Sequence, residues 1–182
     1  MKNPIPTALC ALLLATHTLR ADDAPAESWW SSWKGDVRAT WASDNYSVLV
    51  PFNIYHVRAT YDKEKIKEYN ETPWGLGVEK FHIDEKRNRH SLYLLGFADS
   101  WSDFQPVAGY SWQKNFHCHD ACFGIGYSAM LTGRRKNSYV PIPGVVPVAS
   151  AGYKNVSVQT TWVPYLGHNN GNVFLTMLQI SI

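Results

Sequence analysis

The sequence lacks a strong charge of either sign, and after its first 22 residues it lacks any long apolar run. In 182 residues, 17 basic and 15 acidic side chains leave a formal charge of +2, which argues against a protein that binds nucleic acid over its whole surface. With 18% charged and 45% hydrophobic residues, the chain also lacks the composition of an intrinsically disordered protein. No stretch approaches the roughly 20 apolar residues that a membrane-spanning helix requires. Strands closed into a barrel are the other way to cross a bilayer.

The first 21 residues have the pattern of a secretory signal peptide. Lys2 gives the positive start, an apolar run covers residues 8–15, and Ala21 is a small residue at the expected cleavage site. This run is too short to span a bilayer, and the polar segment 22–25 follows soon after it. We therefore predict a signal peptide over residues 1–21 and an exported mature chain.

Cysteine is scarce. Cys10 lies inside the signal segment, without the surroundings of a lipid-modified cysteine, so Cys118 and Cys122 remain after cleavage. In an exported protein such a pair forms a disulfide by default, here across a turn. Two free thiols and a metal site with His117 or His119 are the alternatives, but four ligands within this short segment do not easily surround one tetrahedral ion. The sequence predicts a disulfide.

Aromatic residues are abundant, with 8 Trp, 10 Tyr and 7 Phe, and Trp and Tyr collect where an apolar surface meets water. From residue 46 onward, segments with an alternation of period two are separated by polar or Gly-, Pro- and Asn-rich breaks. We predict eight strands at residues 46–60, 74–83, 90–98, 106–114, 122–132, 138–153, 156–165 and 172–182. The predicted fold class is therefore all-β, an eight-stranded antiparallel transmembrane β-barrel over residues 46–182.

Within these segments, large apolar residues lie on one face of the strand and small residues on the other. The large residues that show it best are Tyr93, Leu95 and Phe97 in the third strand, Tyr110 and Trp112 in the fourth, and Phe123, Ile125 and Tyr127 in the fifth. A membrane barrel turns its large apolar face to the lipid. We expect these residues outside and the small residues around an interior with room for one slender ligand.

The segment before the barrel predicts an amphipathic helix over residues 26–42. Trp29, Trp33, Val37 and Trp41 recur every four positions, with polar residues elsewhere around the helix. Tryptophans suit a helix that lies in the membrane interface. We predict that residues 22–45 form a periplasmic interfacial segment, while a core helix of a soluble domain is the alternative.

Long and short breaks alternate between the predicted strands. The charged break 62–73 is long and the break 84–90 is shorter, as expected for extracellular loops and periplasmic turns. This alternation brings the end of the first strand, with His56, to the same rim as the pair Asp99 and Ser100. Such a combination could perform acyl transfer, although a structural histidine and an ordinary Asp-Ser turn are the alternatives.

Several ordered motifs point to one known family. The most specific stretches are residues 58–65, 69–75, 97–101, 106–110, 139–143 and 169–173. Over nearly all of its mature length the chain resembles the outer-membrane lipid A palmitoyltransferases. The resemblance implies a tilted barrel with an N-terminal amphipathic helix and an internal hydrocarbon pocket. It also implies transfer of an acyl chain from the sn-1 position of a phospholipid to a hydroxyacyl chain of lipid A.

The resemblance also implies roles for individual residues. His56, Asp99 and Ser100 match the active-site positions of the family. We expect His56 to act as general base on the lipid A hydroxyl, Asp99 to hold its tautomer, and Ser100 to stabilise the oxyanion or its neighbours. Lys65 matches a loop position that the family associates with lipopolysaccharide recognition, where a cation can bind a phosphate of lipid A.

Prolines match family positions where weak strand pairing opens lateral gates for lipid. They are Pro51, Pro73, Pro147 and Pro164. Proline removes a donor from the ladder, and plain strand ends are the alternative explanation for these four residues.

One departure from the family concerns the pocket floor. Ser111 stands where the best-known members of the family have glycine. Its hydroxymethyl group is expected to shorten or polarise the pocket, so we predict a preferred acyl chain of palmitoyl length or somewhat shorter.

The expected partners are a phospholipid donor, a lipid A acceptor and the outer membrane, with no nucleic acid, no cofactor and no metal. We expect a monomer whose active site faces the cell exterior. An outer-membrane phospholipase, which uses water as acceptor, and a non-enzymatic structural or adhesin barrel are the alternative functions.

Overall fold

Eight antiparallel strands close into a barrel in strict sequence order, with β8 pairing back onto β1. The computed structural model describes residues 29–117, 120–168 and 170–182. The predicted signal peptide therefore lies outside the described residues. The strands are β1 Asn45–His56, β2 Gly75–Ile83, β3 Asn88–Ala98, β4 Phe104–Phe116, β5 Ala121–Thr132, β6 Ile142–Tyr153, β7 Val156–Gly167 and β8 Asn170–Ser181. The predicted number of strands and the predicted fold class are confirmed.

The longest differences from the predicted strand limits fall where the chain turns at one end of the barrel. β1 ends at His56 rather than at residue 60, because Arg58–Thr60 forms a short 3-10 helix, η1. β6 starts at Ile142 rather than at residue 138, after the 3-10 helix η2 at Arg135–Asn137. The helix α2, Lys63–Glu68, lies in the connection from β1 to β2. No helix among the described residues is both long enough and apolar enough to cross a membrane.

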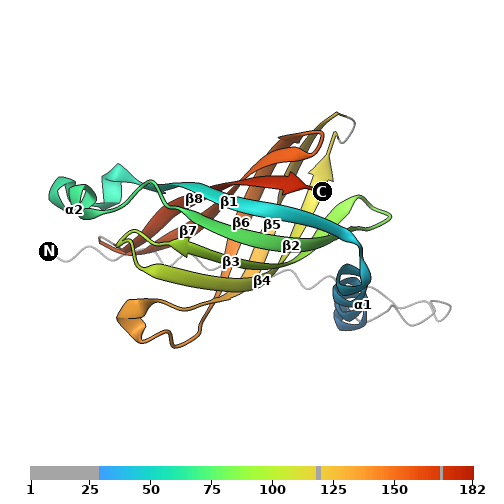
Figure 1. Ribbon diagram of the computed structural model, residues 1–182, viewed down its shortest axis with the longest axis horizontal. Helices are drawn as coiled ribbons and strands as arrows, with labels where there is room; N and C mark the ends of the chain where they lie inside the picture. Colours follow the sequence, from blue (N-terminus) through green and yellow to red (C-terminus); the bar gives the residue numbers. More distant parts are fainter. Residues whose placement is uncertain (1–28, 118–119, 169) are drawn as a thin grey trace, which may run out of the picture.

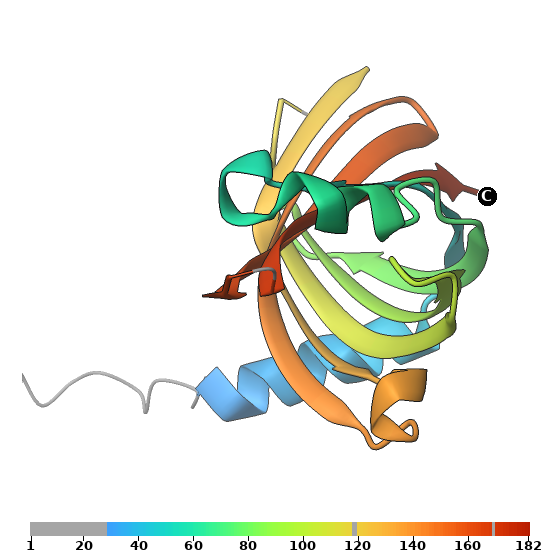
Figure 2. The same cartoon turned by 90° about the vertical axis from the view of Figure 1, so that its left-hand side faces the viewer.

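The two ends of the barrel differ only in part as the alternation of breaks predicts, because the connection 168–169 between β7 and β8 is as short as the turn 154–155 at the opposite end. The long connections 57–74 and 133–141 lie at one end, here called the loop end, and the short turns 84–87 and 154–155 at the other, the turn end. Figure 1 shows α2 at the loop end and the helix α1, Trp29–Ala42, at the turn end. Looking at the loop end, Figure 2 shows the ring of strands with α2 across part of its rim.

The helix α1 lies against the outer wall, where it contacts β2 and β3. Trp33 packs edge-on against Tyr110, with 5.8 Å between ring centroids, and Thr40 is fully buried. Trp29 and Trp41 stay exposed, at 76% and 72%. The helix thus uses one face to contact the barrel and leaves tryptophans available to a surrounding membrane.

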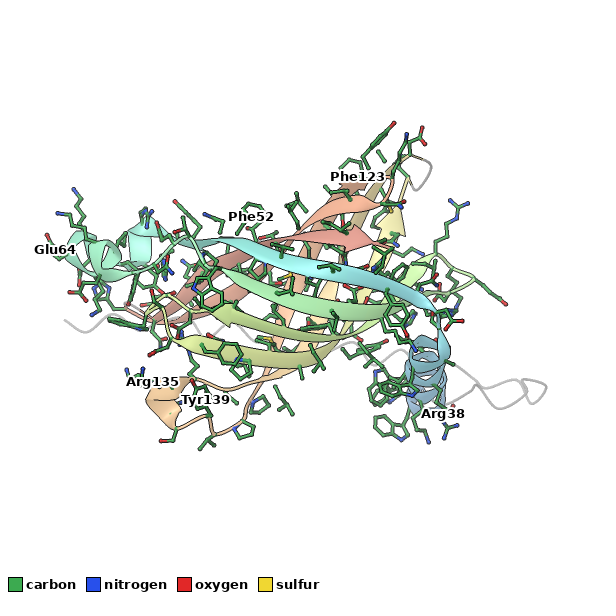
Figure 3. All side chains as sticks on the ribbon, viewed as in Figure 1. Arg38, Phe52, Glu64, Phe123, Arg135 and Tyr139 are labelled. Carbon is green, nitrogen blue, oxygen red and sulfur yellow. The ribbon has the colours of Figure 1, made fainter. Side chains whose placement is uncertain are left out.

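The outer wall is a belt of exposed apolar side chains, which Figure 3 illustrates with Phe52 and Phe123 pointing away from the barrel. Exposed residues of this belt include Leu76, Val78, Leu94, Phe123, Ile125, Tyr127, Leu131 and Val145. The fifth strand is therefore oriented as predicted. The third is not, because Leu95 and Phe97 are buried inside while Leu94 faces out. The interior itself is apolar near the loop end, so side-chain size alone could not identify the outer face of β3.

The interior of the barrel is divided along its axis into an apolar and a polar half. The apolar half, towards the loop end, contains Leu49, Ile54, Leu95, Phe97, Val107 and Met177. The polar half, towards the turn end, contains Ser47, Glu79, Arg89, Ser91, Gln113, Gln159 and Gln179. Glu79 accepts hydrogen bonds from Arg89, Ser91 and Gln179. These partners satisfy the buried charge, and together they form a polar floor beneath the apolar half.

A β-bulge in β1 places His56 inside the barrel. The register against β8 runs in step from Ser47 to Pro51 and shifts by one residue before Asn53. Because the side chains of a strand alternate with period two, an unbroken strand with Ser47 inside would turn Tyr55 inward and His56 outward. The bulge reverses this, so His56 is buried and Tyr55 is exposed.

Strand pairing stops early at two places in the wall, both at the loop end. The β1–β2 ladder ends at Leu49 and Gly77, below Pro51. The β6–β7 ladder ends at Val148 and Thr161, next to Pro147 and below Pro164. Pro73 lies two residues before β2. All four predicted gate prolines therefore flank an unpaired stretch of the wall.

Candidate active site

His56 is the buried centre of an aromatic cluster at the loop end. Only 2% of the residue is exposed. The ring of Tyr69 stacks on its imidazole at 4.5 Å and 19°, and the ring of Tyr61 meets it edge-on at 5.0 Å. The Tyr61 hydroxyl donates to the carbonyl of Gly171 at 2.5 Å, which ties the cluster to β8. This packing leaves the imidazole little rotational freedom.

Both ring nitrogens of His56 have a defined partner. Nδ1 lies 3.0 Å from Glu71 Oε1, and Nε2 lies 3.0 Å from Ser100 Oγ. An ionised carboxylate can only accept, so Nδ1 carries the proton and donates it to Glu71. Nε2 then presents its lone pair and accepts a hydrogen bond from the Ser100 hydroxyl. The result is a neutral imidazole whose basic nitrogen faces a hydroxyl group.

The predicted proximity of His56 and Ser100 is thus observed. The prediction that Asp99 contacts His56 is wrong, because the Asp99 carboxylate has other partners. Asp99 Oδ1 accepts hydrogen bonds from the backbone amides of Trp101 and Asp103, at 2.8 and 3.1 Å. Its Oδ2 lies 3.5 Å from Arg134. A carboxylate folded back onto its own turn in this way cannot reach the imidazole as well. Asp99 instead holds the shape of the β3–β4 connection that carries Ser100.

Glu71 fills the place that Asp99 was expected to fill, and sequence reasoning missed it. It lies in the charged break between β1 and β2, which has the composition of an ordinary solvated loop. Arg58 holds both of its oxygens, with Nη1 to Oε1 at 2.7 Å and Nη2 to Oε2 at 2.6 Å. The hydrogen bond from Arg58, helped by that from His56, lowers the pKa of Glu71 to about 2. The family motifs 58–65 and 69–75 include Arg58 and Glu71, but the sequence does not reveal their contact with each other or with His56, because loop closure brings these residues together.

This pKa predicts how the contribution of Glu71 to stability depends on pH. A carboxyl whose pKa is depressed in the folded state stabilises the fold above its ordinary pKa, near 4.5, and loses that effect as the pH falls towards about 2. We expect the difference in thermal midpoint between the wild type and Glu71→Gln to be constant above pH 4.5 and to shrink below it. Thermal unfolding in detergent, followed by circular dichroism, measures this. A difference that grew on acidification would contradict the assignment.

The predicted lipopolysaccharide residue Lys65 lies beside the candidate site, over the rings of Tyr69 and Trp101. Its Nζ lies 4.5 Å from the ring centroid of Trp101, the residue after Ser100, and 2.6 Å from Glu68 Oε2. Among nearby arginines, Arg58 is engaged by Glu71 and Arg135 lies 3.0 Å from Asp103. The rim above the apolar interior is therefore lined by cations held in aromatic and ionic contacts.

Ser111 lies on the interior face of β4 between the two halves of the barrel. It pairs with Ser91 on one side and Ser128 on the other, and it is 3% exposed. Its hydroxyl oxygen is one of two buried side-chain oxygen atoms among the described residues with no hydrogen-bond partner. Ser111 therefore lies where the apolar half of the interior meets the polar half.

The described residues contain no group of three or more His, Cys, Asp or Glu side chains placed to hold a metal ion. Cys122, at the turn end, is disulfide-bonded. Its predicted partner Cys118 lies outside the described residues.

Known proteins of one family resemble this chain over most of its length. A family model described as "Antimicrobial peptide resistance and lipid A acylation protein PagP" matches residues 36–179. The lipid A acyltransferase PagP of Laribacter hongkongensis is 42% identical over 152 residues, covering 83% of this chain and 73% of that protein. The lipid A palmitoyltransferase PagP of Escherichia coli K12 is 38% identical over 165 residues, 86% of each. The lipid A acyltransferase PagP of Pantoea ananatis is 39% identical over 193 residues, 98% of each.

Proposed function

Since the chain belongs to the PagP family and is a lipid A acyltransferase, we propose that it moves an acyl chain from the sn-1 position of a phospholipid to a hydroxyacyl chain of lipid A. The observation that carries the mechanism is the contact of 3.0 Å between His56 Nε2 and Ser100 Oγ. This contact pairs a ring nitrogen with a hydroxyl group at the end of the barrel where the interior is apolar, which supports acyl transfer at this point.

The proposed reaction is a transesterification with His56 as general base. The lipid A hydroxyl gives its proton to Nε2 as its oxygen attacks the ester carbonyl carbon of the phospholipid. The Ser100 hydroxyl, displaced from Nε2 by this acceptor, donates to the oxyanion that forms. The intermediate collapses, the bond from the carbonyl carbon to the glycerol oxygen breaks, and that oxygen takes the proton back from His56. The products are acylated lipid A and a lysophospholipid.

The apolar half of the interior is the proposed site for the acyl chain. A chain whose ester lies at His56 would pass Phe97, Leu95 and Val107 and meet the polar floor near Ser111. Methylene groups gain about 0.8 kcal/mol each on leaving water, so the chain is favoured until it reaches polar side chains. This supports an acyl-chain length that is set by the position of the polar floor. Palmitoyl or a somewhat shorter chain is the proposed transferred group.

We expect Ser111→Gly to shift the donor preference to longer chains. Removing the hydroxymethyl group deepens the floor and removes a buried hydroxyl without a partner. Each added methylene that becomes accommodated is worth about 0.8 kcal/mol, or roughly fourfold in selectivity. Transfer assays with mixed phospholipids of defined chain length measure the profile. An identical preference for palmitoyl in the wild type and the variant would defeat the assignment.

The two unpaired stretches of the wall are the proposed routes for lipid. The early end of the β1–β2 ladder, at Pro51 and Pro73, and that of the β6–β7 ladder, at Pro147 and Pro164, support lateral gating. There a lipid tail can move between membrane and interior without breaking ladder hydrogen bonds. We further propose that Lys65 binds a phosphate of lipid A at the rim.

The family and the barrel fit an outer-membrane protein. Further proposals are that the loop end, with His56, faces the cell exterior, that residues 22–45 lie at the periplasmic interface, and that the protein is a monomer. The position of α1 at the turn end supports this orientation.

Mass spectrometry of lipid A from cells that express the wild-type protein tests the function. A mass gain of one acyl chain, with lysophospholipid as co-product, is expected. Free fatty acid without acylated lipid A would identify a phospholipase instead. No lipid product from a folded barrel would favour a structural role.

A further inference from the structure

We infer that Glu71, anchored by Arg58, is the positioning residue that fixes His56 in its reactive tautomer. The inference rests on the proposed function and deepens it, because it replaces Asp99 with Glu71 as the carboxylate partner of the base. Glu71 does not touch the reacting atoms. It acts through His56.

The Glu71 carboxylate is held by four hydrogen bonds. Oε1 accepts from the His56 ring at Nδ1, from the His56 backbone amide at 3.2 Å, and from Arg58 Nη1. Oε2 accepts from Arg58 Nη2. A carboxylate that contacts both the backbone and the ring of one histidine restrains the ring relative to its own main chain. Arg58, with its planar fork on both oxygens, fixes the carboxylate in turn.

The chemistry of this contact determines which nitrogen is basic. The low pKa of Glu71 keeps it ionised at neutral pH, so it accepts a hydrogen bond from Nδ1–H and the proton stays on Nδ1. When Nε2 takes a proton during the reaction, the imidazolium lies 3.0 Å from an anion, which stabilises that state. Asp99, engaged by two backbone amides and Arg134, is not placed to give either effect.

The main chain of Glu71 links this role to the wall of the barrel. Above Leu49, β1 no longer pairs with β2, and there the Ile54 amide donates to the Glu71 carbonyl at 2.9 Å. Glu71 thus contacts β1 through its backbone at Ile54 and through its side chain at His56. The segment that covers the unpaired stretch of β1 therefore also fixes the position of the carboxylate that orients His56.

Nitrogen-15 NMR of the imidazole in the full-length mature protein tests the inference. The protein is folded in detergent with labelled histidine, and the His56 signals are assigned by their loss in His56→Asn. We expect protonated Nδ1 and unprotonated Nε2 in the wild type at neutral pH. In Glu71→Gln the amide can donate as well as accept, so a mixture of tautomers or a reversal is expected. Glu71→Asp should keep the wild-type tautomer.

Kinetics give the second measurement. We expect Glu71→Gln to lower kcat by about two to four orders of magnitude, with little change in KM for the phospholipid, and Glu71→Asp to recover part of the rate. The matched control is Glu64→Gln, which removes a carboxylate from α2 in the same connection (Figure 3). It should change neither the tautomer nor kcat by more than about twofold, as expected for an exposed loop position.

An unchanged tautomer together with an unchanged kcat in Glu71→Gln would overturn the inference. If that variant does not fold, Glu71→Ala replaces it, because it also removes the carboxylate, and a pure wild-type tautomer with an unchanged kcat there would overturn the inference. The NMR readout does not depend on activity. A wild type that shows the Glu71-dependent tautomer but never acylates lipid A would refute the proposed function alone.

Discussion

Replacing His56 with alanine is expected to lower the rate of lipid A acylation by about two to four orders of magnitude, the usual contribution of a general base. The variant keeps the apolar interior and the strand gaps, so phospholipid binding should be retained and the loss should appear in kcat. The mass gain of lipid A in cells and the initial rate with purified protein measure it.

The matched control is His168→Ala. His168 lies at the same end of the barrel, where it is 65% exposed and paired with Asp62 at 3.2 Å. Loss of an exposed pair contributes about 0 to 1 kcal/mol, so this variant should acylate lipid A at close to the wild-type rate. A His56→Ala variant that kept more than half of the wild-type rate would show that another group removes the proton.

The position of His56 shows what the sequence could and could not predict. Alternation and the spacing of breaks predicted the eight strands and the rim to which His56 belongs. They did not predict the bulge at Pro51–Asn53, because an extra residue in one strand is visible only in its register with the partner strand. The bulge decides whether His56 faces the interior or the lipid.

The carboxylate partner of His56 shows a second kind of limit. Asp99 was the expected partner because it matches an active-site position of the family, yet its side chain folds onto the amides of Trp101 and Asp103. Glu71 reaches His56 only because the long β1–β2 connection closes over the rim. Contacts made by loop closure depend on the whole path of the loop, and the charged composition of this segment indicated only that it is solvated.

The strand faces show a third limit. In β5 the alternation of large and small residues correctly identified the lipid-facing side. In β3 the large residues Leu95 and Phe97 line the apolar half of the interior instead. A barrel that holds a hydrocarbon chain needs apolar residues on both faces of its strands near the site where the chain binds. The hydrophobic pattern of such a strand does not indicate which face points to the lipid.

Replacing Ser100 with alanine distinguishes an oxyanion donor from a nucleophile by the size of the loss. Removal of one oxyanion donor costs about 10²- to 10³-fold in kcat, whereas removal of a nucleophile that works as a unit with its base costs about 10⁶-fold. We expect the smaller loss, because the mechanism transfers the acyl chain directly to lipid A and Ser100 donates to the carbonyl oxygen. Initial rates are measured for the wild type, Ser100→Ala and His56→Ala, with enough enzyme and time to detect slow turnover in the variants. They give the fold loss in kcat for each variant.

Intact-protein mass spectrometry after incubation with phospholipid alone provides the independent check. With direct transfer, no acylated protein accumulates when lipid A is absent, in the wild type or in Ser100→Ala. A wild-type protein heavier by one acyl group, with the modification at Ser100, would instead establish a covalent route. In that route Nε2 takes the Ser100 proton across the 3.0 Å contact already present, and the lipid A hydroxyl attacks the acyl-enzyme. Both routes use His56 as the base. The Ser100 measurements therefore distinguish the two routes, and the His56→Ala measurement tests the role of His56 separately.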